Sequence, residues 1–269
     1  MIVDVITLKY MTLIIADIED RQIHIESDTL MTNDAQHSNA SVLKSLEYRL
    51  QPKVRILNDG AHAVAFAGLA SCFYNVIKQI QNATSTSKIS TVLLNAHRSC
   101  TDNGDYMTDF ILACATTLEL YRFHGGECTQ INQLCHIGDS EAFNVLQFEK
   151  EKFVGTYSST PDSRQDKITN EFRGILETDS YPSVGGILLG VKSHNGVFSY
   201  KQRQYSTFHL SDSPSEWFDD IQNSTTDIVS VVPCDGFKFH VSFPESKACF
   251  KFVEAEDGSM KPERIGKTA

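Results

Sequence analysis

Short apolar runs at the beginning of the chain predict a series of β-strands. Residues 12–16 are largely apolar, and residues 22–27 alternate polar and apolar side chains, which is typical of a half-buried strand. Two further apolar runs, at residues 53–57 and 63–67, flank a turn at residues 58–60. Apolar runs joined by a short turn of this kind predict a β-hairpin, so we expect the first part of the chain to be built from antiparallel strands.

Apolar residues at helical spacing follow the hairpin. Phe73, Val76, Ile77 and Ile80 fall at i, i+3, i+4 and i+7, the spacing of one face of an amphipathic helix. We expect helices at residues 70–82, 91–99, 140–149 and 162–177, and strands at 108–116, 118–124, 186–192 and 196–205, with a short strand ending at Ile137. Because the helices come in pairs, they do not act as single crossovers between parallel strands. Two antiparallel sheets packed face to face, with a helix pair outside each, would bury both kinds of apolar surface, which predicts an α+β fold.

The last part of the chain predicts a β-rich C-terminal extension. Strands are expected at residues 228–232, 237–243 and 248–253, followed by a frayed polar end from Glu256. The expected organisation is a leader at residues 1–11, a main domain at residues 12–210 and the extension at residues 211–269.

Composition and charge narrow the functional classes. The 269 residues carry a net charge of −10, which argues against a nucleic-acid-binding surface. The seven cysteines are scattered without a CxxC pair, which favours buried thiols in a reducing compartment over a disulfide framework. The N-terminal stretch suits neither a membrane span nor a signal peptide, so we expect a cytoplasmic protein without membrane association. The histidines lack metal-site spacing and no P-loop or dinucleotide fingerprint occurs, so we expect no metal and no cofactor.

The strongest chemical signal is Thr12, which stands directly behind Met11. A hydroxyl is a poor nucleophile at neutral pH and needs an adjacent base. If the chain is cut between Met11 and Thr12, Thr12 gains a free α-amine with a pKa of roughly 7.7–8, which can serve as that base. Either translation starts at Met11 and an aminopeptidase exposes Thr12, or residues 1–11 form a short propeptide.

Four segments together resemble the proteasome β-subunit-like family, which belongs to the N-terminal-nucleophile hydrolases of the threonine peptidase type. The segments are Thr12–Ala16, which looks like the opening strand, Asp28–Thr32, Lys53–Leu57 and Phe66–Gly68. The resemblance implies a four-layer αββα sandwich with a catalytic threonine at the mature N-terminus. It covers about the first two hundred residues and leaves the extension unmatched.

The resemblance also implies a role for each matched residue. Thr12 would attack a peptide carbonyl, and Lys53 would keep the neighbouring α-amine from staying protonated, since like charges disfavour each other. Asp28 would hold Lys53 in place. The Gly68 N–H would face the developing oxyanion, and the Thr32 backbone would pair with an extended peptide as an added strand.

The chain also departs from the family pattern. The stretch between Thr32 and Lys53 is longer than usual, and Lys44 falls at the family's lysine offset from Thr12. We favour Lys53, because the strand-turn-strand pattern follows it without a gap. Leu69 stands where the family has a second glycine, which gives the substrate pocket a bulkier rim.

A second departure lies near the nucleophile, where the family has Gly-Ser-Gly and this chain has Gly138-Asp139-Ser140. Asp139 or Ser140 is expected to contact the α-amine of Thr12, and an acid there would tend to raise the pKa of that amine. Outside the resemblance, the same residues are typical of a helix N-terminus with a serine cap.

The sequence therefore predicts a threonine-type peptidase or amidohydrolase that acts on peptides or unfolded proteins. The resemblance implies assembly into homo-oligomeric rings and an ATPase unfoldase as a partner. Two alternatives stay open: a non-catalytic subunit of a proteasome-like assembly, in which residues 1–11 block Thr12, and an amidase or transpeptidase that acts on a smaller substrate.

Overall fold

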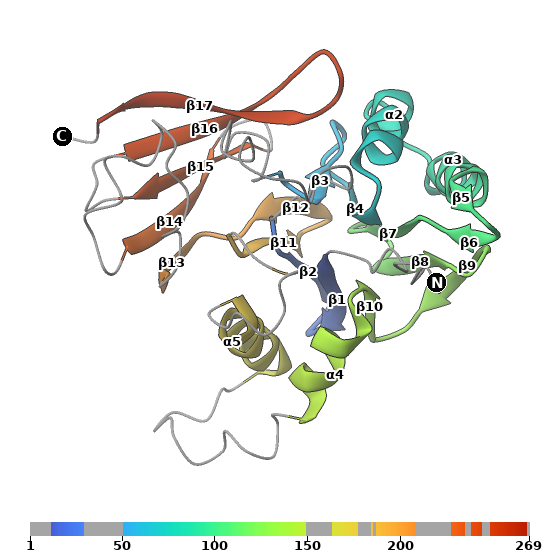
Figure 1. The fold of residues 1–269 in the computed structure, drawn as a ribbon, viewed down its shortest axis with the longest axis horizontal. Helices are drawn as coiled ribbons and strands as arrows, with labels where there is room; N and C mark the ends of the chain where they lie inside the picture. The colour runs from blue at the N-terminus through green and yellow to red at the C-terminus, as the bar shows by residue number, and fades with distance from the viewer. Residues whose placement is uncertain are drawn as a thin grey trace, which may run out of the picture.

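The computed structural model describes residues 12–29, 51–148, 163–176, 184, 187–207, 227–234, 238–243 and 248–267. Within these residues, two five-stranded antiparallel sheets face each other between helices, and a third sheet follows them in the chain (Figure 1). None of the described helices combines the length and apolar character that a bilayer-crossing helix needs.

The first sheet begins with the strand behind Thr12. Its strands, in spatial order, are β10 (Leu134–Gly138), β1 (Leu13–Glu19), β2 (Gln22–Ser27), β11 (Leu189–His194) and β12 (Val197–Tyr200). In the register of β1, Leu13 lies opposite Gly138, and Ile14 lies opposite Ser27. The start of β1 is therefore flanked by the ends of β10 and β2.

The second sheet contains the predicted hairpin. Its strands, in spatial order, are β3 (Val54–Ile56), β4 (His62–Gly68), β7 (Thr108–Cys114), β8 (Glu119–His124) and β9 (Glu127–Ile131). Two short strands that precede β7, β5 (Thr101–Asp102) and β6 (Asp105–Tyr106), pair with each other in a separate two-stranded sheet. The sequence pattern missed β9, because its residues are mostly polar and lie largely exposed at the sheet edge.

The helices cover the outer faces of the two sheets. They are α2 (Ala70–Ile80) and α3 (Thr86–Ser99) on the second sheet, and α4 (Ser140–Phe148) and α5 (Arg164–Leu176) on the first. The predicted face of α2 is buried, since Phe73, Val76, Ile77 and Ile80 are all 2 % exposed or less. This arrangement confirms the predicted α+β four-layer sandwich.

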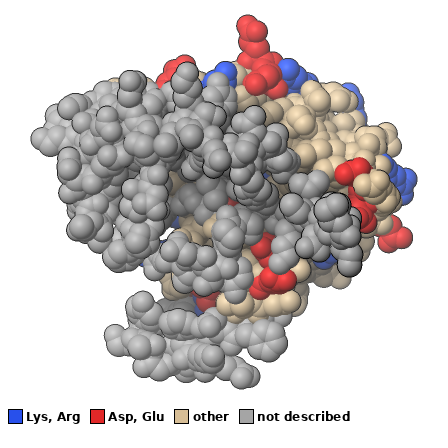
Figure 2. Space-filling model, in the orientation of Figure 1, with Lys and Arg blue, Asp and Glu red and all other residues tan. Residues whose placement is uncertain are grey.

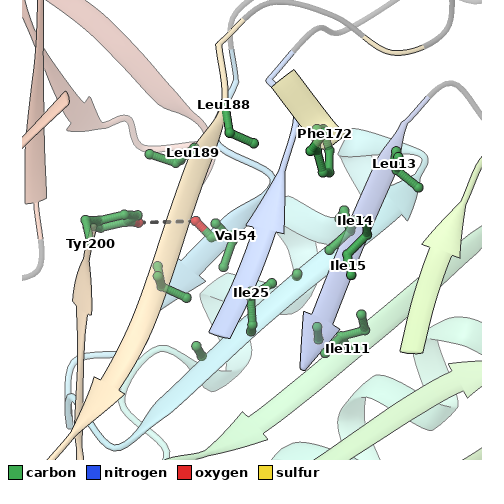
Figure 3. Packing of buried hydrophobic residues seen from close by; sticks show 14 of the residues in the cluster. Leu13, Ile14, Ile15, Ile25, Val54, Ile111, Phe172, Leu188, Leu189 and Tyr200 are labelled. Carbon is green, nitrogen blue, oxygen red and sulfur yellow. Dashed lines mark hydrogen bonds between the residues drawn. The ribbon is translucent and has the colours of Figure 1, made fainter. Parts of the chain in front are cut away.

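The largest core cluster lies between the two sheets. Figure 3 shows Ile15 and Ile25 of the first sheet in the same cluster as Val54 and Ile111 of the second. The hydroxyl of Tyr200 donates a hydrogen bond to the Val54 carbonyl at 3.2 Å, which ties the edge strand β12 to β3. A second cluster fills the space between the second sheet and α2 and α3.

The third sheet makes the C-terminal part of the chain β-rich, as predicted, and it begins with a strand before residue 211. Its strands are β13 (Arg203–Thr207), β14 (Asp227–Cys234), β15 (Lys238–Phe243), β16 (Ala248–Glu254) and β17 (Met260–Lys267), paired in that order. Phe239 of this sheet packs against Tyr200 and Phe252, with ring centroids 4.6 and 4.9 Å apart. The third sheet therefore shares apolar contacts with the main domain.

Two predictions at this end of the chain were wrong. The end was expected to be frayed from Glu256, but residues 260–267 form β17, because its backbone pairs with β16 and its Met260 side chain is buried. The strand expected at 196–205 is divided between β12 and β13, which belong to different sheets. The residues between the two strands are polar, and Lys201 is buried although it is charged. The prediction ran the two strands together across these polar residues.

Charged side chains of both signs are interspersed on the described part of the face in Figure 2, where they border an area without charges. The basic side chains on that part of the face do not gather into a continuous stripe.

Candidate active site

Three of the residues singled out in the sequence meet where β1, β2 and β3 come together. The Lys53 ammonium group contacts Thr12 Oγ1, and it donates to Asp28 Oδ2 at 2.8 Å. Thr12 is 3 % exposed in the chain that includes residues 1–11, and Asp28 and Lys53 are fully buried. The hydroxyl, the cation and the carboxylate thus form one buried chain of contacts.

Asp28 is held by the strand that carries Thr12. Its Oδ1 accepts a hydrogen bond from the Leu13 N–H at 3.1 Å, and its own N–H donates to the Leu13 carbonyl at 3.3 Å. Lys53 is fixed by the hairpin, since its carbonyl accepts from the Phe66 N–H at 3.0 Å. The hairpin that was predicted from the sequence therefore positions Lys53 next to Thr12.

Burial lowers the pKa of Lys53 below its ordinary value, because desolvation disfavours the charged ammonium. The charge of Asp28 and its hydrogen bond act in the opposite direction and offset part of that effect. A buried lysine with a lowered pKa can exchange a proton with a neighbouring hydroxyl more readily than a solvated lysine can.

Two glycines permit close backbone contacts around this group. Gly68 ends β4 with φ +126°, and a Cβ there would lie 2.0 Å from the Met107 carbonyl oxygen. Gly138 ends β10 with φ +94°, and a Cβ there would lie 2.0 Å from the Thr12 carbonyl oxygen. Only glycine fits either position. Next to Gly68, the Leu69 N–H donates to Thr108 Oγ1 at 3.0 Å.

The segment after Gly138 anchors Thr12 through the backbone. The Asp139 N–H donates to the Thr12 carbonyl at 2.7 Å, and Asp139 Oδ1 accepts from the N–H groups of Glu141 and Ala142 at 2.9 and 3.0 Å. The cap of α4 is therefore Asp139, and the predicted serine cap was wrong: Ser140 is the first, exposed residue of the helix. Contact of Asp139 or Ser140 with a free α-amine stays a prediction. Thr32 and Lys44 lie outside the described residues.

The sequence did not single out Thr29 and Gln51, which support the site. Thr29 Oγ1 accepts from the Ile187 N–H at 2.8 Å, and the Thr29 carbonyl accepts from the Gln51 N–H at 2.8 Å. The Gln51 side-chain oxygen accepts in turn from the Tyr74 hydroxyl at 3.2 Å and from the Met260 N–H at 3.3 Å. The one available signal was adjacency, since Thr29 follows Asp28 and Gln51 precedes Lys53 by two residues.

No protein-family model matches the chain, and a sequence comparison with curated proteins finds no match. Solved structures do match. An Anbu Gly-1 mutant from Hyphomicrobium sp. strain MC1 has a TM-score of 0.50 at 16% identity, over 79% of this chain and 92% of that chain. HslV from Trypanosoma brucei has a TM-score of 0.42 at 13% identity, over 68% of this chain and 100% of that chain. BPH from Thiobacillus denitrificans in complex with epoxomicin has a TM-score of 0.45 at 12% identity, over 68% and 98%.

The likeness to Anbu shows the fold of the chain. The protein has a proteasome-like αββα fold, so the resemblance to the proteasome β-subunit-like family is confirmed at the level of the fold. Fold alone does not define function, so any activity depends on the residues around Thr12.

Proposed function

We propose that the protein is a threonine-type amidohydrolase, most simply a peptidase, whose nucleophile is Thr12 after residues 1–11 are removed. The observation that carries the proposal is the contact of the Lys53 ammonium group with both Thr12 Oγ1 and Asp28 Oδ2. Attack by a hydroxyl needs an adjacent base, and here a buried lysine, held by a buried carboxylate, contacts the threonine hydroxyl.

Two amines can take the Thr12 hydroxyl proton in this proposal. The first is the α-amine that cleavage would create on Thr12 itself. The second is the side chain of Lys53, which already touches Oγ1 and whose pKa is lowered by burial. Asp28 keeps Lys53 in place in both cases, and the cation of Lys53, when protonated, disfavours a proton on the α-amine.

The reaction follows as acyl transfer. Thr12 Oγ1 attacks the substrate carbonyl carbon, and the Gly68 N–H donates to the oxyanion that forms. The C–N bond then breaks, the leaving amine takes the proton from the base, and an ester on Thr12 remains. Water hydrolyses this ester, releases the acid and restores the hydroxyl.

We propose peptides or unfolded proteins as substrates, with the Thr32 backbone and the rim at Gly68 and Leu69 as the binding surface. The resemblance further supports a cytoplasmic homo-oligomeric ring, with an ATPase unfoldase as a partner.

A second candidate is a non-catalytic subunit of a proteasome-like assembly. In that case residues 1–11 stay attached, and the α-amine of Thr12 remains part of a peptide bond.

The experiment is peptide turnover by Thr12→Ser and Thr12→Ala beside the wild-type protein. Thr12→Ser keeps a hydroxyl and is expected to keep turnover, whereas Thr12→Ala is expected to abolish turnover and still bind an extended peptide. Turnover that survives in Thr12→Ala would exclude the proposed nucleophile. Wild-type protein with a free Thr12 that cleaves no member of a peptide library would favour the small-amide alternative.

A further inference from the structure

A cysteine, a histidine and an aspartate meet at the end of the second sheet that lies away from the candidate active site. His62 begins β4, whose other end is Gly68, and His62 lies directly opposite Cys114, the last residue of β7. Side chains of directly opposed residues in antiparallel strands are close neighbours. Asp59 lies in the turn before β4 and completes the cluster.

Asp59 orients the imidazole ring. Its Oδ1 accepts from the N–H groups of Ala61 and His62 at 3.0 and 3.1 Å, and its Oδ2 accepts from His62 Nδ1 at 2.6 Å. This bond places a proton on Nδ1 and turns Nε2 away from the turn, toward Thr86 Oγ1 at 2.9 Å. The Cys114 side chain lies next to the same ring, because the two residues are directly opposed in the sheet. The arrangement is the one in which a carboxylate holds an imidazole beside a nucleophile.

Hydrogen-bond donors surround the sulfur of Cys114. The Thr116 hydroxyl lies 3.2 Å from Sγ, and His62 and the backbone N–H of Thr117 also donate to it. Burial by itself raises the pKa of the Cys114 thiol, but these hydrogen bonds outweigh burial and lower that pKa to about 5. The donors thus favour the thiolate form.

Within the described part of the chain, two further ionisable groups near the thiol, Glu119 and Tyr121, belong to β8. Glu119 lies opposite Cys114 in the sheet, and its Oε2 accepts from the Thr117 hydroxyl at 2.7 Å. Tyr121 lies close enough for the charge of Cys114 to contribute to the raised pKa of the Tyr121 phenol. The negative charge of the Glu119 carboxylate would repel a thiolate at Cys114. The contacts of the sulfur with His62, Thr116 and Thr117 act against that repulsion.

We propose that His62 and Asp59 activate the Cys114 thiol and make it a modification site for small electrophiles of the peroxide class. Cys114 is 2 % exposed beneath the exposed Thr116 and Thr117, which restricts the reagents to small molecules. The site is separate from Thr12, so it persists in a Thr12→Ala variant.

The oxidation step uses the groups of this cluster. The thiolate sulfur attacks one peroxide oxygen, the S–O bond forms as the O–O bond breaks, and hydroxide leaves. The sulfur is oxidised by two electrons to a sulfenic acid and the peroxide is reduced. The leaving hydroxide takes a proton from the His62 imidazolium and departs as water, which leaves a neutral imidazole.

The test is the rate at which iodoacetamide alkylates each cysteine of the folded full chain between pH 6 and pH 8, measured by mass spectrometry of the peptides. An ordinary thiol with a pKa near 8.5 reacts roughly 75-fold faster at pH 8 than at pH 6, because its thiolate fraction rises by that factor. For Cys114 we expect less than a twofold change over this range. Cys72 and Cys135, where burial raises the thiol pKa to about 12, are internal controls that should remain unreactive.

Three variants distinguish activation of Cys114 by His62 from a general change in the access of the reagent to the cysteines. His62→Gln removes the imidazole and should restore the steep pH dependence at Cys114, whereas His124→Gln removes a histidine–aspartate pair elsewhere and should leave Cys114 unchanged. Cys114→Ser should lose the sulfenic acid that dimedone traps after peroxide treatment. A Cys114 that stays unalkylated in the folded chain, or that follows the 75-fold dependence of an ordinary thiol, would overturn the proposal.

Discussion

The carboxylate of Asp28 accepts a hydrogen bond from the Leu13 N–H at 3.1 Å, and Leu13 is the residue that follows Thr12. The second oxygen of the same carboxylate holds Lys53 at 2.8 Å. One side chain therefore fixes both the backbone beside the proposed nucleophile and the cation on its hydroxyl, although the three residues come from three different strand ends.

This relationship predicts the effect of Lys53→Ala. Turnover should fall by roughly 10²–10⁴-fold, because the loss of a positioned base or of the group that tunes it typically costs that much. Lys44→Ala should leave turnover unchanged, as should Lys88→Ala, which alters an exposed lysine on α3. Steady-state kinetics on one peptide substrate measure all three. Loss of activity in Lys44→Ala with full activity in Lys53→Ala would assign the catalytic lysine to residue 44.

Two glycines provide a matched pair of stability predictions. Gly68→Ala should destabilise the fold by about 1–3 kcal/mol or more, because its φ of +126° and the Met107 carbonyl leave no room for a Cβ. Gly174→Ala should stabilise it by about 1 kcal/mol, since this residue is exposed in α5 and a Cβ there meets nothing within 4 Å. Denaturant unfolding measures both. Equal effects of the two substitutions would contradict the positive φ of Gly68 and its close contact with the Met107 carbonyl.

His136 predicts a pH dependence of stability. Burial and the nearby Arg122 and His124 lower its pKa to about 4, so the folded chain keeps the ring neutral where it stacks on Phe143. Below about pH 6.5 the unfolded chain binds a proton that the folded chain does not, so stability is lost as the pH falls from there toward 4.

The corresponding variant is His136→Phe, which keeps an aromatic ring against Phe143 and removes the titrating group. The Tm of the variant should fall less between pH 7.5 and pH 5 than the Tm of the wild-type chain. Thermal unfolding at the two pH values measures the difference. Parallel decreases in Tm would show that His136 does not contribute to the acid sensitivity.

Phe239 predicts that the third sheet contributes to the stability of the main domain. Phe239→Ala should cost about 3–5 kcal/mol, because the ring is 1 % exposed and contacts both Tyr200 and Phe252. A single unfolding transition at lower denaturant is the expected result. Two separate transitions, with the main domain unaffected, would indicate that the extension unfolds alone.

Much of the fold could be predicted from local patterns. The apolar stripe of α2 and the alternation in β2 depend on neighbouring residues, and both elements formed where they were expected. The strand β17 could not be predicted, because it owes its pairing to β16 rather than to an apolar pattern of its own. The change of sheet after Tyr200 depends on tertiary contacts, which the local pattern of residues 196–205 does not specify.

Some residues of the candidate site could likewise be predicted from local patterns, and others depend on tertiary contacts. The hairpin pattern after Lys53 distinguished it from Lys44, and the Lys53 ammonium group contacts the Thr12 hydroxyl in the structure. The roles of Thr29 and Gln51 arise from contacts with Ile187 and Met260, which are distant in sequence, so spacing alone could not indicate them.

The central claim is that Thr12 acts as an N-terminal nucleophile, and the intact mass of purified, active native protein tests it most directly. The proposed mechanism predicts a mass that corresponds to a chain starting at Thr12, without residues 1–11. Active protein whose mass retains residues 1–11 would contradict the mechanism, because the α-amine of Thr12 would then still be part of a peptide bond.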